Sequence, residues 1–329
     1  MRPPFSLAVL LALLACTPAL ATAGPARSTA PVKSAIFYYP WYGNPSHDGA
    51  YEHWQQNGGQ PPQRIASAYF PARGVYSSGD RALVGAQMRE IAATGVDEVV
   101  VSWWGRGSLE DARLGLTVAA ARAAGLSVAA HVEPYPGRSA ASVEADAAYF
   151  GQLGITDVYV YRADDVSADD WAPVNDRIAA PTRVFAQTGR IGQAAAGHFD
   201  GVYTYDILVL GGGSFRRICS QAHAAGLLCA PSVGPGYDAL RASGDARLKA
   251  RRRGATYDAM WQAALASGGD LVTITSYNEW HEGTQIEPAR ARAGYRSYAG
   301  AWGRQGRSAE TAYVDRTADW VRRLEQRAG

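Results

Sequence analysis

The stretch that decides the fold is residues 96–135, VDEVVVSWWGRGSLEDARLGLTVAAARAAGLSVAAHVEPY. It contains two β-type runs, at 96–104 and 126–135, that are rich in valine and aromatic residues. Between them, residues 110–125 carry apolar residues at helical spacing and end in glycine, as helices commonly do. This order of strand, helix and strand is typical of proteins in which parallel strands alternate with helices.

The same alternation recurs along most of the chain. Working outward from this unit, we count eight β-type runs in all. The other six are 35–42, 157–163, 182–188, 201–206, 227–234 and 271–280. Eight such alternations in about 300 residues predict an α/β protein with a single-domain (β/α)8 TIM barrel.

A doubly wound open sheet is the alternative fold. No Gly-x-Gly-x-x-Gly follows any of the runs, and polar and aromatic residues end nearly every run instead of gathering at one switch point. The GGG at 211–213 lacks the Lys-Ser/Thr of a phosphate loop, so we expect a flexible loop at the barrel rim. The pattern therefore favours the barrel.

The N-terminal segment is typical of an export signal. Residues 1–23 contain Arg2, a short apolar run and Ala-x-Ala cleavage sites, which predict a removed signal peptide and a secreted protein. Lipid attachment at Cys16 is the alternative, because LLAC resembles a lipoprotein box. We expect residues 24–33 to form a polar, disordered lead-in and residues 34–329 to form the (β/α)8 domain. No later stretch approaches the ~20 apolar residues of a transmembrane helix.

Composition narrows the class of partner. The chain has 9 Trp and 18 Tyr beside 7 Phe, and flat side chains with a polar handle suit surfaces that stack on sugars. The net charge is only +2, and the one basic run, RLKARRRG at 247–254, is interpreted as a solvated helix end or loop. We therefore expect no nucleic acid partner. Cys219 and Cys229 remain after signal removal, either as a disulfide or as two separate thiols.

The ends of the runs carry the candidate site, because the C-terminal ends of barrel strands line the mouth where active sites lie. The run at 201–206 also ends in Asp206. The residues that we expect to bind substrate are Tyr39, Trp41, Trp104, His131, Glu133, Tyr135, Tyr203, Tyr205, Asn278, Trp280 and His281. Together they predict an aromatic-walled cleft that contains carboxylates.

Glu279 and Glu282, three residues apart after the last run, are the best candidates for catalysis. Two carboxylates among stacking aromatics are the minimum needed to hydrolyse a glycosidic bond. The alternative is a structural salt bridge for one glutamate and simple exposure for the other. Zinc chemistry is disfavoured because HEGTQ lacks the second histidine of His-Glu-x-x-His. A Ser-His-Asp enzyme is also disfavoured, because the sequence contains no Gly-x-Ser-x-Gly motif.

Seven motifs, in order along nearly the whole mature chain, resemble glycoside hydrolase family 99, the endo-α-mannosidases and endo-α-1,2-mannanases. The motifs are FYYPWYG (37–43), YFPARGVYSSGD (69–80), VSWWG (101–105), HVEPY (131–135), FDGVYTYD (199–206), PSVGPGYD (231–238) and ITSYNEWHEGTQIEP (274–288). The resemblance implies a retaining, endo-acting hydrolase on a (β/α)8 barrel that needs no metal or other cofactor. It also implies that Tyr39, Glu133, Tyr203 and Tyr205 lie near the bound sugar.

The resemblance implies roles for the two glutamates. Glu282 would be the general acid/base, and Glu279 would remove the proton from the substrate's own 2-hydroxyl, which forms a 1,2-anhydro sugar. Trp104 stands where the animal enzymes carry Tyr, which favours an endo-α-1,2-mannanase acting on α-mannan or mannose-rich oligosaccharides. An endo-α-mannosidase that releases glucosyl-mannose and a non-catalytic carbohydrate-binding barrel are the alternatives. We expect a monomer.

Overall fold

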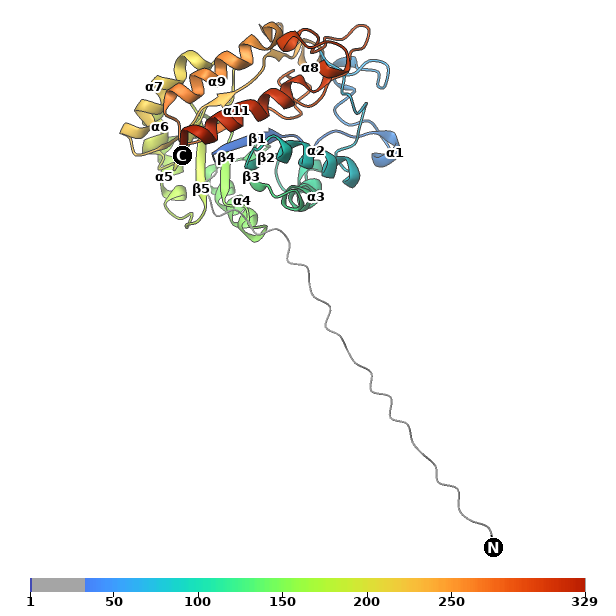
Figure 1. Ribbon diagram of the computed structural model, residues 1–329. Helices are drawn as coiled ribbons and strands as arrows, with labels where there is room; N and C mark the ends of the chain where they lie inside the picture. The colour runs from blue at the N-terminus through green and yellow to red at the C-terminus, as the bar shows by residue number, and fades with distance from the viewer. Residues whose placement is uncertain (2–32, 329) are drawn as a thin grey trace.

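Parallel strands form the body of the protein, and helices surround them (Figure 1). In this computed structural model, the described residues are Met1 and 33–328. The predicted signal peptide and nearly all of the predicted lead-in lie outside the described residues. From Ser34 onward the chain alternates strands and helices as the sequence predicts.

The barrel is built from strands that pair in chain order. They are β1 (Ser34–Tyr38), β2 (Glu98–Trp103), β3 (Ser127–Val132), β4 (Asp157–Val160), β5 (Arg183–Gln187), β6 (Gly201–Tyr203), β7 (Leu228–Ala230), β8 (Ser232–Val233) and β11 (Val272–Ile274). Only Pro231 separates β7 from β8; β7 pairs with β6, β8 pairs with β11, and β11 pairs with β1. Because β7 and β8 are halves of one strand, the nine segments make eight strand positions and the ring closes.

Helices cover the outside of the ring. The longer ones are α2 (Arg81–Ala93), α3 (Leu109–Ala123), α4 (Ala140–Gln152), α5 (Ala168–Asn175), α6 (Ile191–Ala196), α7 (Gly212–Ala224), α9 (Ala255–Ser267) and α11 (Ala312–Ala328). Side chains of Asp80, Ser108, Ser139 and Ser167 accept bonds from the first free backbone amides of α2, α3, α4 and α5, which fixes where these helices begin. Among the described residues, no helix is both long and apolar enough to cross a lipid bilayer.

The last helix completes the ring of helices. In Figure 1, α11 runs between α9 and α2. Trp320 of α11 stacks on Trp261 of α9 with ring centroids 6.1 Å apart, and Val321 approaches Gly95 just after α2. A single barrel domain with helices on its outside is therefore confirmed.

The loop expected at residues 211–213 is wrong, because these glycines begin α7. Gly211 is the N-cap residue, and Gly212 and Gly213 form the first turn. A Cβ on Gly212 would lie 2.9 Å from the Cβ of Ala263 in α9, so the missing side chain lets α7 and α9 pack closely. The two cysteines form a disulfide that joins α7 to β7, which decides between the alternatives left open by the sequence.

Side chains that point into the barrel form a packed lower layer. Phe37, His131, Tyr159 and Tyr203 come from four different strands and meet edge to face or stacked. The rings of Phe37 and His131 are 4.6 Å apart, and those of Tyr159 and Tyr203 are 5.1 Å apart. All of these residues are fully buried, so they make a solid floor beneath the mouth.

Candidate active site

An upper layer of polar side chains lies directly on this floor. Residues two positions further along a strand point to the same side, so each floor residue is followed by a residue facing the mouth. These followers are Tyr39, Glu133, Tyr161 and Tyr205. The rings of Tyr161 and Tyr205 lie 5.4 Å apart, and the hydroxyls of Tyr39 and Tyr205 are hydrogen-bonded.

Both candidate acids lie on one closed turn, residues 276–286, which we name the acid turn. Ser276 N donates to Thr284 O at 3.1 Å, and Ile286 N donates to Ser276 O at 2.9 Å, so the two ends are held together. Gly283 has a φ of +64°, and a Cβ there would lie 3.0 Å from Asp238 O. Only glycine fits this position without strain, and the turn depends on it.

Glu279 lies in the upper layer beside the tyrosine pair. The Tyr205 hydroxyl donates to Glu279 Oε2 at 2.6 Å, and Ser276 Oγ accepts from the Glu279 amide at 2.9 Å. Burial raises the pKa of Glu279 well above its ordinary value, and the charge of Glu282 raises it further. The hydrogen bond from Tyr205 acts in the opposite direction and favours the ionised carboxylate.

Glu282 opens onto a pocket at the barrel mouth. The polar residues that line this pocket with Glu282 are Tyr161, Tyr205, Asp206, Tyr237, Arg247, Thr275 and Thr284. Burial, followed by the charges of Asp206 and Glu133, raises the pKa of Glu282 to about 8, and Arg247 opposes this rise. A carboxyl group with such a pKa carries a proton at neutral pH and can act as an acid.

Glu133 belongs to the upper layer and directly follows the last residue of β3. Ser102 Oγ donates to Glu133 Oε1 at 2.8 Å, and His131 Nδ1 lies 3.1 Å from the same oxygen. The other nitrogen of His131 is 2.9 Å from the Tyr203 hydroxyl. His131 and Tyr203 have no exposed surface, so the structure places these two predicted substrate contacts in the floor, where they support Glu133 from below.

A cluster of aromatic rings forms one wall of the mouth. Trp41 stacks on His53 with centroids 4.6 Å apart, and Tyr39, His281 and Trp104 lie 4.6, 5.5 and 6.5 Å from Trp41. The indole nitrogens of Trp41 and Trp104 have no hydrogen-bond partner among the described residues. Burial lowers the pKa of His281 to about 3 and that of His53 to about 4, so both rings are neutral around pH 7.

Three further predicted contacts point away from the mouth. Asn278 is fully buried and bonds both the amide and the carbonyl of Tyr39, at 2.7 and 3.0 Å. The hydroxyl of Tyr135 forms hydrogen bonds with Ser142 and Asp146 of α4. The indole of Trp280 is fully buried on the far side of the acid turn. The structure therefore gives these residues supporting positions.

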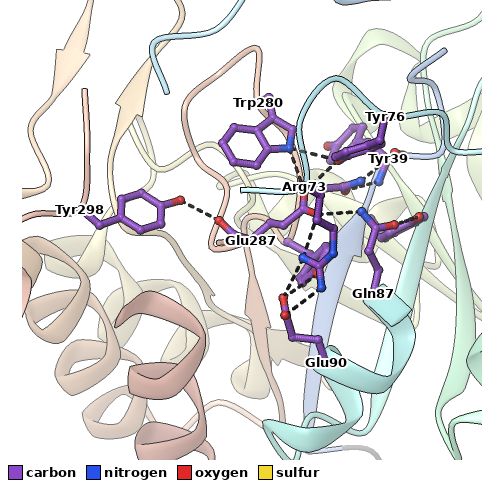
Figure 2. A network of polar contacts seen from close by, with 11 residues as sticks. Tyr39, Arg73, Tyr76, Gln87, Glu90, Trp280, Glu287 and Tyr298 are labelled. Carbon is purple, nitrogen blue, oxygen red and sulfur yellow. Dashed lines mark hydrogen bonds and ion pairs between the residues drawn. The ribbon is translucent and has the colours of Figure 1, made fainter. Parts of the chain in front are cut away.

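Trp280 leads into a buried polar network around Glu287 (Figure 2). One carboxylate oxygen of Glu287 accepts from Trp280 Nε1 and the Tyr76 hydroxyl, both at 2.8 Å. The other accepts from Gln87 Nε2 at 2.8 Å and from Arg73 at 3.3 Å. Arg73 also pairs with Glu90 at 2.9 Å. Both carboxylate oxygens of Glu287 therefore have hydrogen-bond partners, as buried polar groups require. Because Gln87 and Glu90 belong to α2, the network also connects the acid turn to that helix.

Sequence reasoning missed four residues of the mouth. Tyr161 follows Tyr159 by two positions on strand four, so strand alternation was the available signal. His53 comes from the loop after β1, and Tyr237 and Arg247 come from the segment after β8. The side chains of those loops have no fixed period, and only the folded chain brings them to the pocket.

The arrangement can move two protons at neighbouring places. Burial raises the pKa of both glutamates, but Glu279 accepts a hydrogen bond from a hydroxyl that favours its ionised form, whereas Glu282 faces the pocket without such a donor from Tyr205. Both belong to one short turn, so they can act on adjacent atoms of one ligand. Neutral aromatic rings and tyrosines around them suit a sugar more than a charged ligand.

Comparison with known proteins agrees with this chemistry. The model of glycosyl hydrolase family 99 matches residues 32–164 and 186–326. A glycoprotein endo-alpha-1,2-mannosidase-like protein of Danio rerio is 31% identical, with 77% of this chain and 70% of the relative covered. The glycoprotein endo-alpha-1,2-mannosidase of Xenopus laevis is 29% identical, with 77% of this chain and 69% of that protein covered. The solved GH99 endo-alpha-mannosidase of Bacteroides thetaiotaomicron superimposes with a TM-score of 0.80 at 27% identity, covering 90% of this chain and 98% of that one.

Proposed function

The chain belongs to glycosyl hydrolase family 99 and is an endo-acting glycoside hydrolase, and on that premise we propose that it cleaves internal α-mannosidic bonds with retention of configuration. The observation that carries the proposal is the acid turn, which presents Glu279 and Glu282 together at the barrel mouth. The proposed substrate is α-mannan or a mannose-rich oligosaccharide.

In the first step, Glu279 takes the proton from the 2-hydroxyl of the reacting mannose. The freed O2 attacks the anomeric carbon C1 as the glycosidic C1–O bond breaks, and Glu282 gives its proton to the departing oxygen. The products are a 1,2-anhydro sugar and the shortened glycan. The raised pKa of Glu282 supports its role as the acid, and the hydroxyl bond from Tyr205 supports Glu279 as the base.

In the second step, Glu282 is a carboxylate and removes a proton from water. The water oxygen attacks C1, the C1–O2 bond breaks, and Glu279 returns its proton to O2. Each step inverts the configuration at C1, so the net result is retention. The axial 2-hydroxyl of mannose suits this route because it can lie opposite the α leaving group.

Substrate contacts come from the residues that line the mouth. Among the residues expected from the sequence, we assign this role to Tyr39, Trp41, Trp104, Glu133, Tyr205 and His281. Tyr161, Tyr237 and Arg247 join them because they line the pocket of Glu282. Trp104 is half-buried beside Trp41, so part of its ring stays accessible for stacking on a sugar. Its presence favours an α-1,2-mannan over a glucosyl-mannose substrate.

Export is part of the proposal. The signal-like segment 1–23 implies secretion, and the Cys219–Cys229 disulfide supports it because disulfides persist in oxidising compartments. A monomeric state stays a prediction. Lipid attachment at Cys16 stays the alternative for the final location.

The test is digestion of yeast α-mannan and of a defined α-1,2-linked mannose tetrasaccharide, with products separated by chromatography. We expect internal cleavage that releases a mannose disaccharide, and NMR of the first product should show the α-anomer before mutarotation. Matched reactions with Glu279→Gln and Glu282→Gln control for contaminating enzymes. No cleavage of mannan or of a glucosyl-mannose glycan, together with tight binding of either, would favour the non-catalytic carbohydrate-binding barrel.

A further inference from the structure

The basic run at 247–254 is not a solvated helix end or loop as expected, because part of it packs against the acid turn. Residues 248–249 form β10 (Leu248–Lys249), which pairs antiparallel with β9 (Tyr237–Asp238). Alternate residues of the run then contact the rest of the protein, with burial increasing from the exposed Arg247 to Arg251. Arg247 lines the pocket of Glu282, Lys249 Nζ donates to Ile207 O at 2.7 Å, and Arg251 is buried. We name residues 236–251 the strap.

Arg251 makes the most direct contact with the acid turn. Its Nη2 donates to Gly283 O at 2.9 Å and to Gln285 O at 2.6 Å. The backbone amide of Asp238, in the same strap, donates to Glu282 O at 2.7 Å. The strap therefore holds three carbonyls of the turn, beginning with that of Glu282 itself.

The guanidinium of Arg251 lies in an aromatic cage. The ring centroids of Tyr69, Tyr298 and Tyr313 are 4.6, 4.8 and 4.5 Å from its central carbon. Its Nε and Nη1 have no hydrogen-bond partner among the described residues. Burying a cation this way is expensive, and cation–π contacts offset only part of the cost. An apolar side chain of similar size would fill the cage without that cost, and it would lose only the bonds to the turn.

We propose that Arg251 is a positioning residue for the reaction: by fixing the carbonyls of Gly283 and Gln285, it holds Glu282 at the pocket. Arg251 touches neither acid headgroup, so its effect passes through the backbone of the turn. The Glu287 network holds the turn as well, through the indole of Trp280, as Figure 2 shows. The turn is therefore held by two sets of contacts, and the one from Arg251 acts on the residue that directly follows Glu282.

The test compares Arg251→Met with Arg251→Lys and with Arg252→Met, an exposed arginine of the same run. We expect Arg251→Met to lower kcat about 10²-fold, as misplacement of a catalytic group by a small distance does, with KM nearly unchanged. The alkaline limb of its pH profile should also move, because Glu282 changes surroundings. Arg251→Lys should recover part of the rate, and Arg252→Met should match the wild type.

A purely structural role predicts a different result. Arg251→Met would then unfold at lower temperature, yet below that temperature its kcat and its alkaline limb would equal those of the wild type, which would overturn the proposal. If Arg251→Met does not fold, Tyr298→Phe removes a hydroxyl that donates to Gln285 O and Glu287 O but keeps the caging ring. Wild-type kcat in both Arg251→Lys and Tyr298→Phe would also overturn it.

This inference rests on the proposed function only where activity is the readout. Hydrogen exchange of a peptide covering residues 276–287 provides a readout that needs no substrate. Arg251→Lys should speed exchange in that peptide and leave the α5 peptide unchanged. If Arg251→Lys speeds exchange in this peptide but the wild type cleaves no glycan, the positioning role of Arg251 is upheld and the proposed function is contradicted. If the wild type is active but Arg251→Lys leaves exchange unchanged, only the positioning role is contradicted.

Discussion

Removal of the Tyr205 hydroxyl is the most informative single perturbation of the site. Tyr205→Phe keeps the ring that packs on Phe37 and Tyr161 but deletes the donor 2.6 Å from Glu279 Oε2. A hydrogen bond to a charged group contributes about 1.5–3 kcal/mol, and each pKa unit corresponds to about 1.4 kcal/mol. The variant should therefore raise the pKa of Glu279 by about one to two units.

The direction follows from the role of the base. Tyr205 favours ionised Glu279, so losing the hydroxyl makes protonation easier and removes active base at low pH. The acidic limb of kcat/KM should move to higher pH by about one to two units, and kcat at neutral pH should fall by at most about 10- to 100-fold. The Tyr39 hydroxyl also favours the ionised carboxylate of Glu279, so we expect the smaller pH shift and the smaller fall in kcat.

The assay is the initial rate on the mannose tetrasaccharide between pH 4 and 9. Tyr257→Phe is the matched control, since it deletes another buried hydroxyl, 2.9 Å from Thr317, away from the mouth. Both variants should keep the wild-type fold by circular dichroism. An acidic limb that stays in place, or moves to lower pH, would refute the assignment of Glu279 as a base tuned by Tyr205.

Four other outcomes follow from the structure. Glu282→Gln should lower turnover about 10²–10⁴-fold while tryptophan fluorescence still reports binding of the tetrasaccharide; retained turnover would exclude it as the acid. The wild-type rate should fall above about pH 8, because Glu282 has a pKa raised to about 8 and must be protonated to act, and a rate that is flat to pH 10 would contradict this. Gly283→Ala should lower both stability, by about 1–3 kcal/mol in denaturant unfolding, and kcat, because its Cβ would press on Asp238; wild-type kcat would show that the turn tolerates a side chain. Replacing Cys219 and Cys229 by Ser should lower the free energy of unfolding by about 3 kcal/mol, as expected for a loop of about ten residues, with kcat unchanged; equal stability would show that the crosslink adds nothing.

The strands were predictable because their signals are local. Each of the eight β-type runs corresponds to a strand position, but the runs extend past the strands at their C-terminal ends. Residues 39–42 and 275–280 leave the sheet because their side chains build the mouth and the acid turn. Period-two alternation also predicts which residues share a layer, as Phe37 and Tyr39 illustrate.

The rest of the site depends on contacts that the sequence does not encode locally. Trp280 lies between two mouth residues in the chain, yet it points to Glu287 because the turn reverses there. Arg251 belongs to a run with the composition of a solvated loop, and only the cage of three distant tyrosines buries it. Such placements follow from long-range packing, which composition and spacing do not show.

The central claim is that Glu279 and Glu282 serve adjacent atoms of one mannose, with the 2-hydroxyl as the nucleophile. The most direct measurement is the rate on a tetrasaccharide whose reacting mannose lacks that hydroxyl, compared with the parent under the same conditions. The account predicts no detectable cleavage of the 2-deoxy substrate by an enzyme that binds it. Cleavage of the 2-deoxy substrate at a rate near that of the parent would contradict the account.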